Sequence, residues 1–267
     1  MSYDPQAVAD QEHKTWQGAA DDYVDFIAPF TATAGQLPIL QEIGRISKQD
    51  SVLELGCGTG DLACQLNEIA DRVVGIDFAE NMIDIAARRF SDIEFKTADA
   101  EKVPFTDGAF DVVISNYTAH HFARPQTVFE EARRVLKPGG RLAVIMPIQS
   151  EQKSFGAFFS SATEEIPPED VPGGPLLIAT KPEELTHFIE AAGFAEVTGE
   201  KRVKPVHLPN LDILLNAGWS FMALHDKPQD VQDRIREKTI ERAGPYQEPD
   251  GSYKFPDNVL AASGVKA

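Results

Sequence analysis

The sequence predicts an α/β protein built around a mostly parallel β-sheet with helices on both faces. The chain has 267 residues, of which 42% are hydrophobic and 25% charged, as in a globular protein with a sizeable core. Short apolar runs alternate with segments whose apolar residues recur at helical spacing. Such strand–helix repeats pair in parallel through right-handed crossovers. Ligands of these sheets bind beyond the carboxyl ends of the strands, so we expect the functional residues there.

Each expected element has a basis in the local sequence. The apolar run 52–55 is stopped by Gly56, and Leu62 and Leu66 then begin a helical spacing. Proline and glycine at 138–140 are typical of a helix end followed by a turn. We expect strands at 52–55, 72–77, 93–95, 110–115, 141–146, 195–204 and 258–265. We expect helices at 62–69, 79–90, 126–136 and 182–192, and a helical pattern over 211–243.

The chain is expected to form one domain, 1–267, with four parts. Residues 1–48 form an N-terminal helical lid, and 49–147 form the cofactor-binding core. Five prolines in 147–178, together with Gly173 and Gly174, predict a lid or loop, placed at 148–180. The substrate-side half, 181–267, contains a helical insertion at 210–243 before the last strand.

Charge and composition exclude several classes of function. The formal net charge is −17 and the isoelectric point is near 4.7. A surface this acidic disfavours nucleic acid and anionic lipid, because both are bound largely through Lys and Arg. The sequence has neither a long apolar span nor a secretory signal, so a cytoplasmic location is expected. Cys57 and Cys64 are too sparse for a disulfide framework or a zinc site, and no metal is expected.

A glycine turn joins the first strand to the first helix. Gly56, Gly58 and Gly60 let the backbone turn sharply and approach a ligand without interference from a Cβ atom. Asp77 ends the second strand, where a carboxylate can accept two hydrogen bonds from a ribose diol. The alternatives are a merely tight connection at the turn and a helix cap at Asp77. Together, the turn and the acid favour a nucleoside ligand.

The spacing of the glycines separates two kinds of nucleotide site. A dinucleotide site has G-x-G-x-x-G, so that the pyrophosphate can lie at the helix N-terminus. Here the run is G-x-G-x-G, and Glu54 precedes it. A carboxylate beside the loop would repel a pyrophosphate. A ligand with a cationic amino-acid end fits better.

These residues resemble the class I S-adenosylmethionine-dependent methyltransferases, in particular the small-molecule branch that includes the ubiquinone/menaquinone-biosynthesis methyltransferases. The resemblance covers roughly residues 50–147. It rests on five motifs, which are VLELGCGTG (52–60), GID (75–77), ADA (98–100) followed by VPF (103–105), FDVV (110–113) and RVLKPGG (134–140). It implies a Rossmann-like sheet of seven mostly parallel strands whose last strand is antiparallel.

The resemblance also implies S-adenosyl-L-methionine as the cofactor and a set of residues that bind it. Gly56, Gly58 and Gly60 would line its methionine and ribose, Glu54 would orient its ammonium group, and Asp77 would hold the ribose hydroxyls. On the adenine side, Phe78 would pack near the ring, Asp99 would read its amino group, and the backbone of Ala100 would lie alongside. Asn116 would offer its main-chain carbonyl to the ammonium group. Phe78 as a helix-stapling hydrophobe and Asp99 as a turn residue remain alternatives.

Two adjacent histidines are the best-placed titratable groups for catalysis. His120 and His121 follow the fourth strand, and either is a candidate general base for an acceptor that must lose a proton. Surface or capping histidines are the alternative. The candidate substrate residues are Trp16 and Tyr23 near the N-terminus, Tyr117 beside the histidines and Trp219 in the late insertion. Core packing is the commoner role for aromatics at helical spacing.

The sequence therefore predicts an enzyme that transfers a methyl group from S-adenosylmethionine to a small organic acceptor. It does not specify the acceptor, the atom methylated or the oligomeric state. Two alternatives stay open, a nicotinamide-dependent oxidoreductase and a catalytically silent cofactor-binding or scaffold protein.

Overall fold

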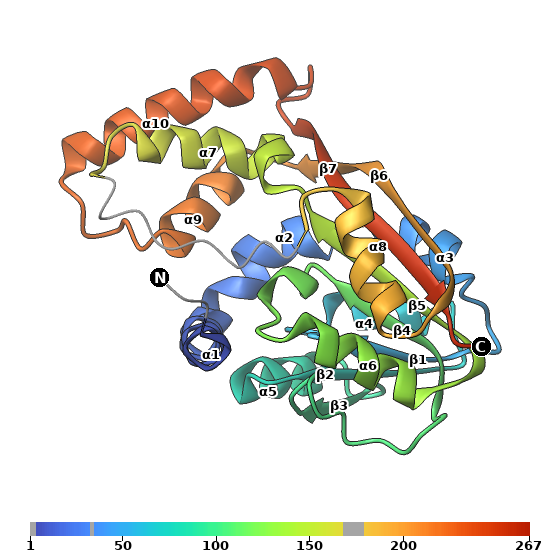
Figure 1. Ribbon diagram of the computed structural model, residues 1–267. Helices are drawn as coiled ribbons and strands as arrows, with labels where there is room; N and C mark the ends of the chain where they lie inside the picture. Colours follow the sequence, from blue (N-terminus) through green and yellow to red (C-terminus); the bar gives the residue numbers. More distant parts are fainter. Residues whose placement is uncertain (1–3, 33–34, 168–178) are drawn as a thin grey trace.

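The structure is a computed structural model that describes residues 4–32, 35–167 and 179–267. Its centre is a seven-stranded sheet in the order β3-β2-β1-β4-β5-β7-β6 (Figure 1). The strands are β1 Ser51–Leu55, β2 Arg72–Asp77, β3 Glu94–Thr97, β4 Phe110–Asn116, β5 Leu136–Pro147, β6 Ala195–Leu208 and β7 Tyr253–Val265. The strands from β3 to β5 pair in parallel, and β7 is antiparallel to both β5 and β6. The predicted Rossmann-like sheet with an antiparallel last strand is confirmed.

The order in which successive strands are added to the sheet reverses at β1. This strand pairs with β2 on one side, where Leu55 faces Ile76, and with β4 on the other, where Leu55 faces Ser115. Successive crossovers therefore leave β1 in opposite directions. The loops after β1 and β4 diverge there and leave a crevice at the carboxyl ends of the strands, the usual ligand site of such sheets.

Helices cover both faces of the sheet because the strand side chains alternate between two cores. Leu53 and Leu55 belong to the core that includes α6 (Pro125–Val135) and α8 (Pro182–Ala191). Val52 belongs to the core on the opposite face. That second core includes α3 (Leu37–Gly44) and α4 (Asp61–Asn67), while α5 (Glu80–Arg89) packs beside β2 and β3. The crevice at the end of β1 thus lies in a rigid three-layer frame.

The N-terminal segment is helical, as expected, and lies across the carboxyl end of the sheet. It consists of α1 (Pro5–Asp22), a π-helical turn η1 (Tyr23–Ile27) and α2 (Ala28–Thr31). The Asp4 side chain caps α1 by accepting hydrogen bonds from the backbone N–H groups of the first turn. Helix α1 contacts α5 and α9, which brings its side chains beside the crevice.

Three core side chains fix the carboxyl end of α2. Consecutive carbonyls at 30–32 accept hydrogen bonds from Lys204 Nζ, from Asn116 Nδ2 at 2.7 Å and from Gln65 Nε2 at 2.7 Å. These donors come from β6, β4 and α4, so they tie the N-terminal segment to widely separated parts of the core. A cation at the end of a helix also complements its dipole.

Three further helices form a second lobe around their own apolar core. They are α7 (Lys153–Thr163), α9 (Asp212–Phe221) and α10 (Gln229–Ala243), seen at the upper left of Figure 1. Phe158 of α7 meets Trp219 of α9 edge to face, with ring centroids 4.9 Å apart. Gly218 lets the two helices approach, because a Cβ atom there would lie 2.3 Å from the Phe158 ring. Among the described residues, no helix is long and apolar enough to span a bilayer.

Helix α7 corrects the prediction of a lid or loop at 148–180. All five prolines lie outside this helix, and Phe155, Phe158 and Ala162 have helical spacing within it. The Asp257 carboxylate of β7 caps its first turn by accepting hydrogen bonds from Ser154 N and Ser154 Oγ. Of the predicted loop, residues 168–178 are outside the described residues. The helical pattern over 211–243 consists of two helices, α9 and α10.

Asp111 links β4 to its neighbours at the amino ends of the strands, far from the crevice at their carboxyl ends. Its removal should therefore destabilise the protein without changing the crevice. Its Oδ2 accepts from Ser51 N, Ser51 Oγ and Lys137 Nζ at 2.7–2.9 Å. Burial opposes ionisation, but these hydrogen bonds outweigh it and lower the pKa of Asp111 to about 2. We expect Asp111→Asn to lower the free energy of unfolding by about 1–3 kcal/mol at neutral pH.

The pH dependence of that loss provides its check. Because the pKa is lower in the folded state, the carboxylate stabilises the protein above its ordinary pKa of 3.8, and this contribution is lost as the pH falls toward about 2. Urea unfolding at neutral pH and near pH 3 should therefore show a smaller difference between wild type and variant in acid. A difference that stays constant would contradict the assignment.

Candidate functional site

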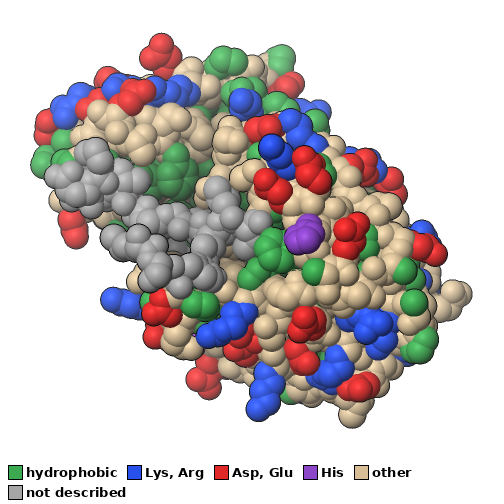
Figure 2. Space-filling view, in the orientation of Figure 1, with side chains coloured by type: hydrophobic (Ala, Val, Ile, Leu, Met, Phe, Trp, Pro, Cys, Tyr) green, Lys and Arg blue, Asp and Glu red, His purple; other side chains and the backbone are tan. Residues whose placement is uncertain are grey.

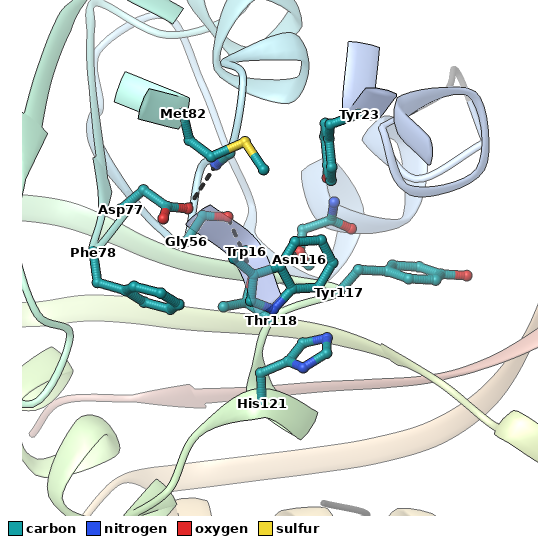
Figure 3. Close-up of a pocket in the computed structure, with 11 residues that line it drawn as sticks. Trp16, Tyr23, Gly56, Asp77, Phe78, Met82, Asn116, Tyr117, Thr118 and His121 are labelled. Atoms are coloured by element: carbon teal, nitrogen blue, oxygen red, sulfur yellow. Dashed lines mark hydrogen bonds between the residues drawn. The ribbon is translucent and has the colours of Figure 1, made fainter. Parts of the chain in front are cut away.

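Residues from the carboxyl ends of β1, β2 and β4 line a cavity of about 60 Å³ together with residues of α1 and η1 (Figure 3). Its lining consists of Trp16, Tyr23, Gly56, Gly58, Asp77, Phe78, Met82, Asn116, Tyr117, Thr118 and His121. A neighbouring cavity of about 270 Å³ shares Gly56, Asp77, Phe78, Thr118 and His121 and adds Asp99 and Ala100. Most of the residues predicted to bind a cofactor therefore converge on one crevice.

The glycine turn leaves no room for a side chain at its start. Gly56 has a φ of 69°, and its N–H donates to the Ile76 carbonyl at 2.8 Å. A Cβ atom at this position would lie 2.2 Å from Thr118 Cγ2. Thr118 Oγ1 donates to the Gly56 carbonyl at 3.2 Å, so the loop after β4 supports the turn after β1. Backbone atoms consequently form the floor of the crevice.

The carboxylate of Asp77 is held in place by two backbone donors. Gly58 N donates to Oδ2 and Ala79 N to Oδ1, each at 2.9 Å. Burial raises the pKa of Asp77, and the hydrogen bonds from Ala79 and Gly58 partly offset that effect. Each carboxylate oxygen has a second lone pair, so the group can accept the two hydroxyls of a ribose diol.

Glu54 lies two residues before the turn and is 2% exposed. Its Oε2 is buried and has no hydrogen-bond partner among the described residues. Burial, then Asp61 and Asp77, raise the pKa of this carboxyl well above its ordinary value. Glu54 lines neither of the two cavities. A buried carboxylate without a partner is unfavourable, and the cationic group of a ligand bound beside it would supply the missing partner.

The larger cavity has an aromatic wall and an acidic edge. Phe78 stacks on His13 of α1 with ring centroids 5.4 Å apart. Asp99 Oδ1 accepts from Glu101 N at 2.8 Å, which fixes the carboxylate while its other oxygen remains available. Ala100 lies in the same wall. An aromatic face beside a fixed acceptor suits a flat base with an exocyclic amino group.

The two histidines have different environments. His120 is buried, its Nδ1 has no partner among the described residues, and burial followed by His121 lowers its pKa well below the ordinary value. His121 lines both cavities, and its Nδ1 lies 2.9 Å from Glu12 Oε2 of α1. His121 is therefore the histidine that can meet a ligand.

The remaining predicted residues lie around or away from the crevice. Tyr23 Oη forms a hydrogen bond with Thr31 Oγ1 at 2.9 Å. The Tyr117 backbone has a φ of 53°, and Lys204 Nζ lies over the Tyr117 ring. Gly60 packs against α5 and β3, because its Cβ would lie 2.8 Å from Phe95. Trp219 lies in the core between α9 and α7 rather than in either cavity.

Several lining residues were not predicted from the sequence, among them Glu12, His13, Met82 and Thr118. Trp16 Nε1 donates to Glu12 Oε2 at 3.0 Å, and the four-residue spacing of this pair on a helix was the available signal. That signal shows which residues share a face of α1, but not what the face covers.

Comparison with known proteins agrees with this geometry. Residues 53–144 match a family described as a methyltransferase domain. A demethylmenaquinone methyltransferase of Lactococcus lactis is 42% identical over 103 residues, which are 36% of this chain and 41% of that protein. Its counterpart in Thermus thermophilus is 41% identical over 114 residues, 40% of this chain and 52% of that protein. The chain thus spans about half the length of these curated relatives or less.

Solved structures share the fold over most of the chain. A possible histamine N-methyltransferase of Thermotoga maritima aligns with a TM-score of 0.56 at 19% identity, covering 95% of this chain and 99% of that one. A phosphoethanolamine N-methyltransferase of Haemonchus contortus, in complex with S-adenosylhomocysteine, aligns with a TM-score of 0.57 at 20% identity, covering 94% and 57%. Residues 53–144 therefore match a methyltransferase domain and resemble the demethylmenaquinone methyltransferases, and the chain shares its fold with solved methyltransferases.

Proposed function

We propose that the protein transfers a methyl group from S-adenosyl-L-methionine to a small organic acceptor. The observation that carries this proposal is the buried Glu54 carboxylate without a partner, two residues before the glycine turn and on the next strand from Asp77. Glu54 itself lines neither of the two cavities, but it lies on the strand next to Asp77. Two carboxylates so close together suit a ligand that is cationic at one end and carries a diol. They do not suit a pyrophosphate.

The described residues fit the parts of this cofactor. Glu54 would hold the ammonium group, together with the main-chain carbonyl of Asn116, which lies 3.0 Å from Thr118 Oγ1. Asp77 would hold the ribose hydroxyls. Phe78, Asp99 and Ala100 line the larger cavity, where the adenine would lie. When bound, the cofactor supplies a methyl group already activated by the positive charge on sulfur.

The protein's own contribution is alignment and the exclusion of water. Trp16 and Tyr23 of the N-terminal segment line the smaller cavity opposite the glycine turn. That segment is fixed to the core by the side-chain donors at the end of α2. Holding an acceptor in line with a reactive carbon can lower a barrier by about 7–11 kcal/mol in well-oriented systems.

The surface suits a small acceptor better than nucleic acid. On the face shown in Figure 2, Lys and Arg side chains are scattered among Asp and Glu, in keeping with the net charge of −17. Both cysteines are free, which fits the reducing cytoplasm that we propose as the location. The matched relatives are named demethylmenaquinone methyltransferases, so demethylmenaquinone belongs among the acceptors to be tried.

The test is transfer of a labelled methyl group. Purified protein is incubated with methyl-labelled S-adenosylmethionine and a panel of hydroxyarenes, reduced quinones, amines and thiols. We expect one class of acceptor to gain the label and Asp77→Ala to abolish the gain. Cofactor binding without transfer to any acceptor would favour the silent binding protein, and binding of NAD instead would favour the oxidoreductase.

A further inference from the structure

His121 belongs to a small polar cluster that joins α1 to the loop after β4. Glu12 Oε2 accepts from Trp16 Nε1 at 3.0 Å and lies 2.9 Å from His121 Nδ1. The His121 and Glu12 side chains are only 12% and 15% exposed. Trp16 also meets the imidazole edge to face, with ring centroids 5.1 Å apart. The cluster fixes the ring from two sides.

This arrangement determines which nitrogen of His121 can accept a proton. An ionised carboxylate only accepts hydrogen bonds, so the neutral ring must carry its hydrogen on Nδ1, facing Glu12. Nε2 is then the unprotonated nitrogen. No hydrogen bond to Nε2 is found among the described residues, and the ring points into the cavity that Trp16, Asp77 and the glycine turn also line (Figure 3).

We propose that Glu12 is a positioning residue, which holds His121 as the general base for an acceptor with a phenolic or enolic hydroxyl. This inference rests on the proposed methyl transfer. His121 Nε2 takes the hydroxyl proton while the acceptor oxygen, or a carbon conjugated with it, bonds to the methyl carbon. The bond from the methyl carbon to sulfur breaks, and the electron pair of that bond stays on sulfur.

The charges of the crevice suit this step. The reaction removes one positive charge from sulfur and places one on the imidazole of His121, so the site keeps the same net charge. The charged and titratable groups nearest His121 include Glu12 of α1, Asp77 at the end of β2 and the neighbouring His120, and the larger cavity that His121 lines also holds His13, Asp99, Glu101 and Arg124. The Glu12 and Asp77 carboxylates stabilise an imidazolium, whereas the burial of His120 keeps that ring neutral.

The class of acceptor follows from the need for a base. A phenol or enol is largely protonated at neutral pH and becomes a far better nucleophile when its proton is removed. An amine that binds in its neutral form needs no such help. The Trp16 and Tyr23 rings in the same cavity wall favour a flat, apolar acceptor.

A purely structural role for Glu12, anchoring α1 to the core, makes a different prediction. An anchor needs the contact but not a particular protonation state of the ring. Nitrogen-15 NMR of the protein saturated with S-adenosylhomocysteine distinguishes the two roles, with His121→Ala used to assign the signal. We expect neutral His121 to carry its hydrogen on Nδ1, and Glu12→Ala to abolish that preference.

The matched control is Gln11→Ala, which changes the neighbouring exposed position of α1, where the Gln11 side chain donates to Thr15 Oγ1. It should leave the His121 spectrum unchanged. A hydrogen on Nε2 in the wild type, or a Glu12→Ala spectrum like that of the wild type, would overturn the proposal. This readout needs no acceptor, so it is independent of the outcome of the methyl-transfer screen.

Turnover gives the second readout. With a phenolic acceptor from the screen, His121→Ala should lower kcat by about 100-fold and Glu12→Ala by at least about tenfold, with cofactor affinity within about twofold of wild type. A nitro-substituted analogue that is already ionised at the assay pH should restore most of both losses. Equal losses with both acceptors would show that the two residues only hold the structure. Failure of the proposed function would appear differently, as absence of transfer by the wild type itself.

Discussion

Replacing Asp77 by alanine is expected to weaken S-adenosylmethionine binding by well over tenfold while leaving the protein folded. The side chain would no longer receive the ribose diol, and the Gly58 N–H would lose its acceptor in the glycine turn. Both effects act on the same part of the crevice, and a tenfold change corresponds to about 1.4 kcal/mol. Asp77→Asn keeps the shape and one acceptor oxygen, so it should bind with intermediate affinity. Calorimetric titration and a melting curve measure both properties.

The control is Asp111→Asn, which removes a hydrogen-bonded carboxylate at the amino ends of the strands, away from the crevice. It should lower stability and leave the dissociation constant unchanged, the reverse of the result at Asp77. An unchanged dissociation constant for Asp77→Ala, together with a normal melting curve, would remove Asp77 from the site.

Glu54→Gln is expected to weaken cofactor binding by at least about tenfold at neutral pH and to flatten its pH dependence. Burial raises the pKa of both Glu54 and Asp77 in the ligand-free protein. A cationic ligand favours the charged carboxylates, so binding should release protons, and affinity should increase as the pH rises above the ordinary value of 4.5 for Glu54. Glutamine cannot ionise and should lose this dependence.

Calorimetry in buffers with different ionisation enthalpies counts the protons released. S-adenosylhomocysteine keeps the ammonium group but lacks the charge on sulfur, so Glu54→Gln should weaken both ligands equally. Loss confined to S-adenosylmethionine would mean that Glu54 faces the sulfur instead. Glu130→Gln, on the exposed face of α6, is the matched control and should change nothing. Wild-type binding that is independent of pH would contradict the assignment.

The fold of the core was predictable because its signals are local. An apolar run ended by Gly56, and helices marked by periodicity and by glycine and proline stops, fix the order of strands and helices without long-range information. The same local order places Glu54, Asp77 and Asn116 at the ends of three strands. Because the carboxyl ends of parallel strands lie on the same side of the sheet, the topology brings these three residues close together.

What the sequence could not reveal depends on contacts between distant segments. Glu12 and His121 are 109 positions apart, and nothing local indicates that α1 lies over this loop. Helix α7 was missed because the prolines on either side dominate the composition, while its capping residue, Asp257, lies 103 positions after Ser154. Trp219 was a candidate substrate residue, with core packing as the alternative, and its contact with Phe158 is visible only in the tertiary structure.

The central claim is that the crevice at the end of β1 binds S-adenosylmethionine, and titration of the wild-type protein with this cofactor and, separately, with NAD tests it most directly. The acidic lining and the G-x-G-x-G turn predict saturable binding of S-adenosylmethionine at a single site and no measurable binding of NAD. Saturable binding of NAD alone, or of neither ligand even in the presence of an acceptor, would contradict the account and reduce the glycine turn to a feature of the fold.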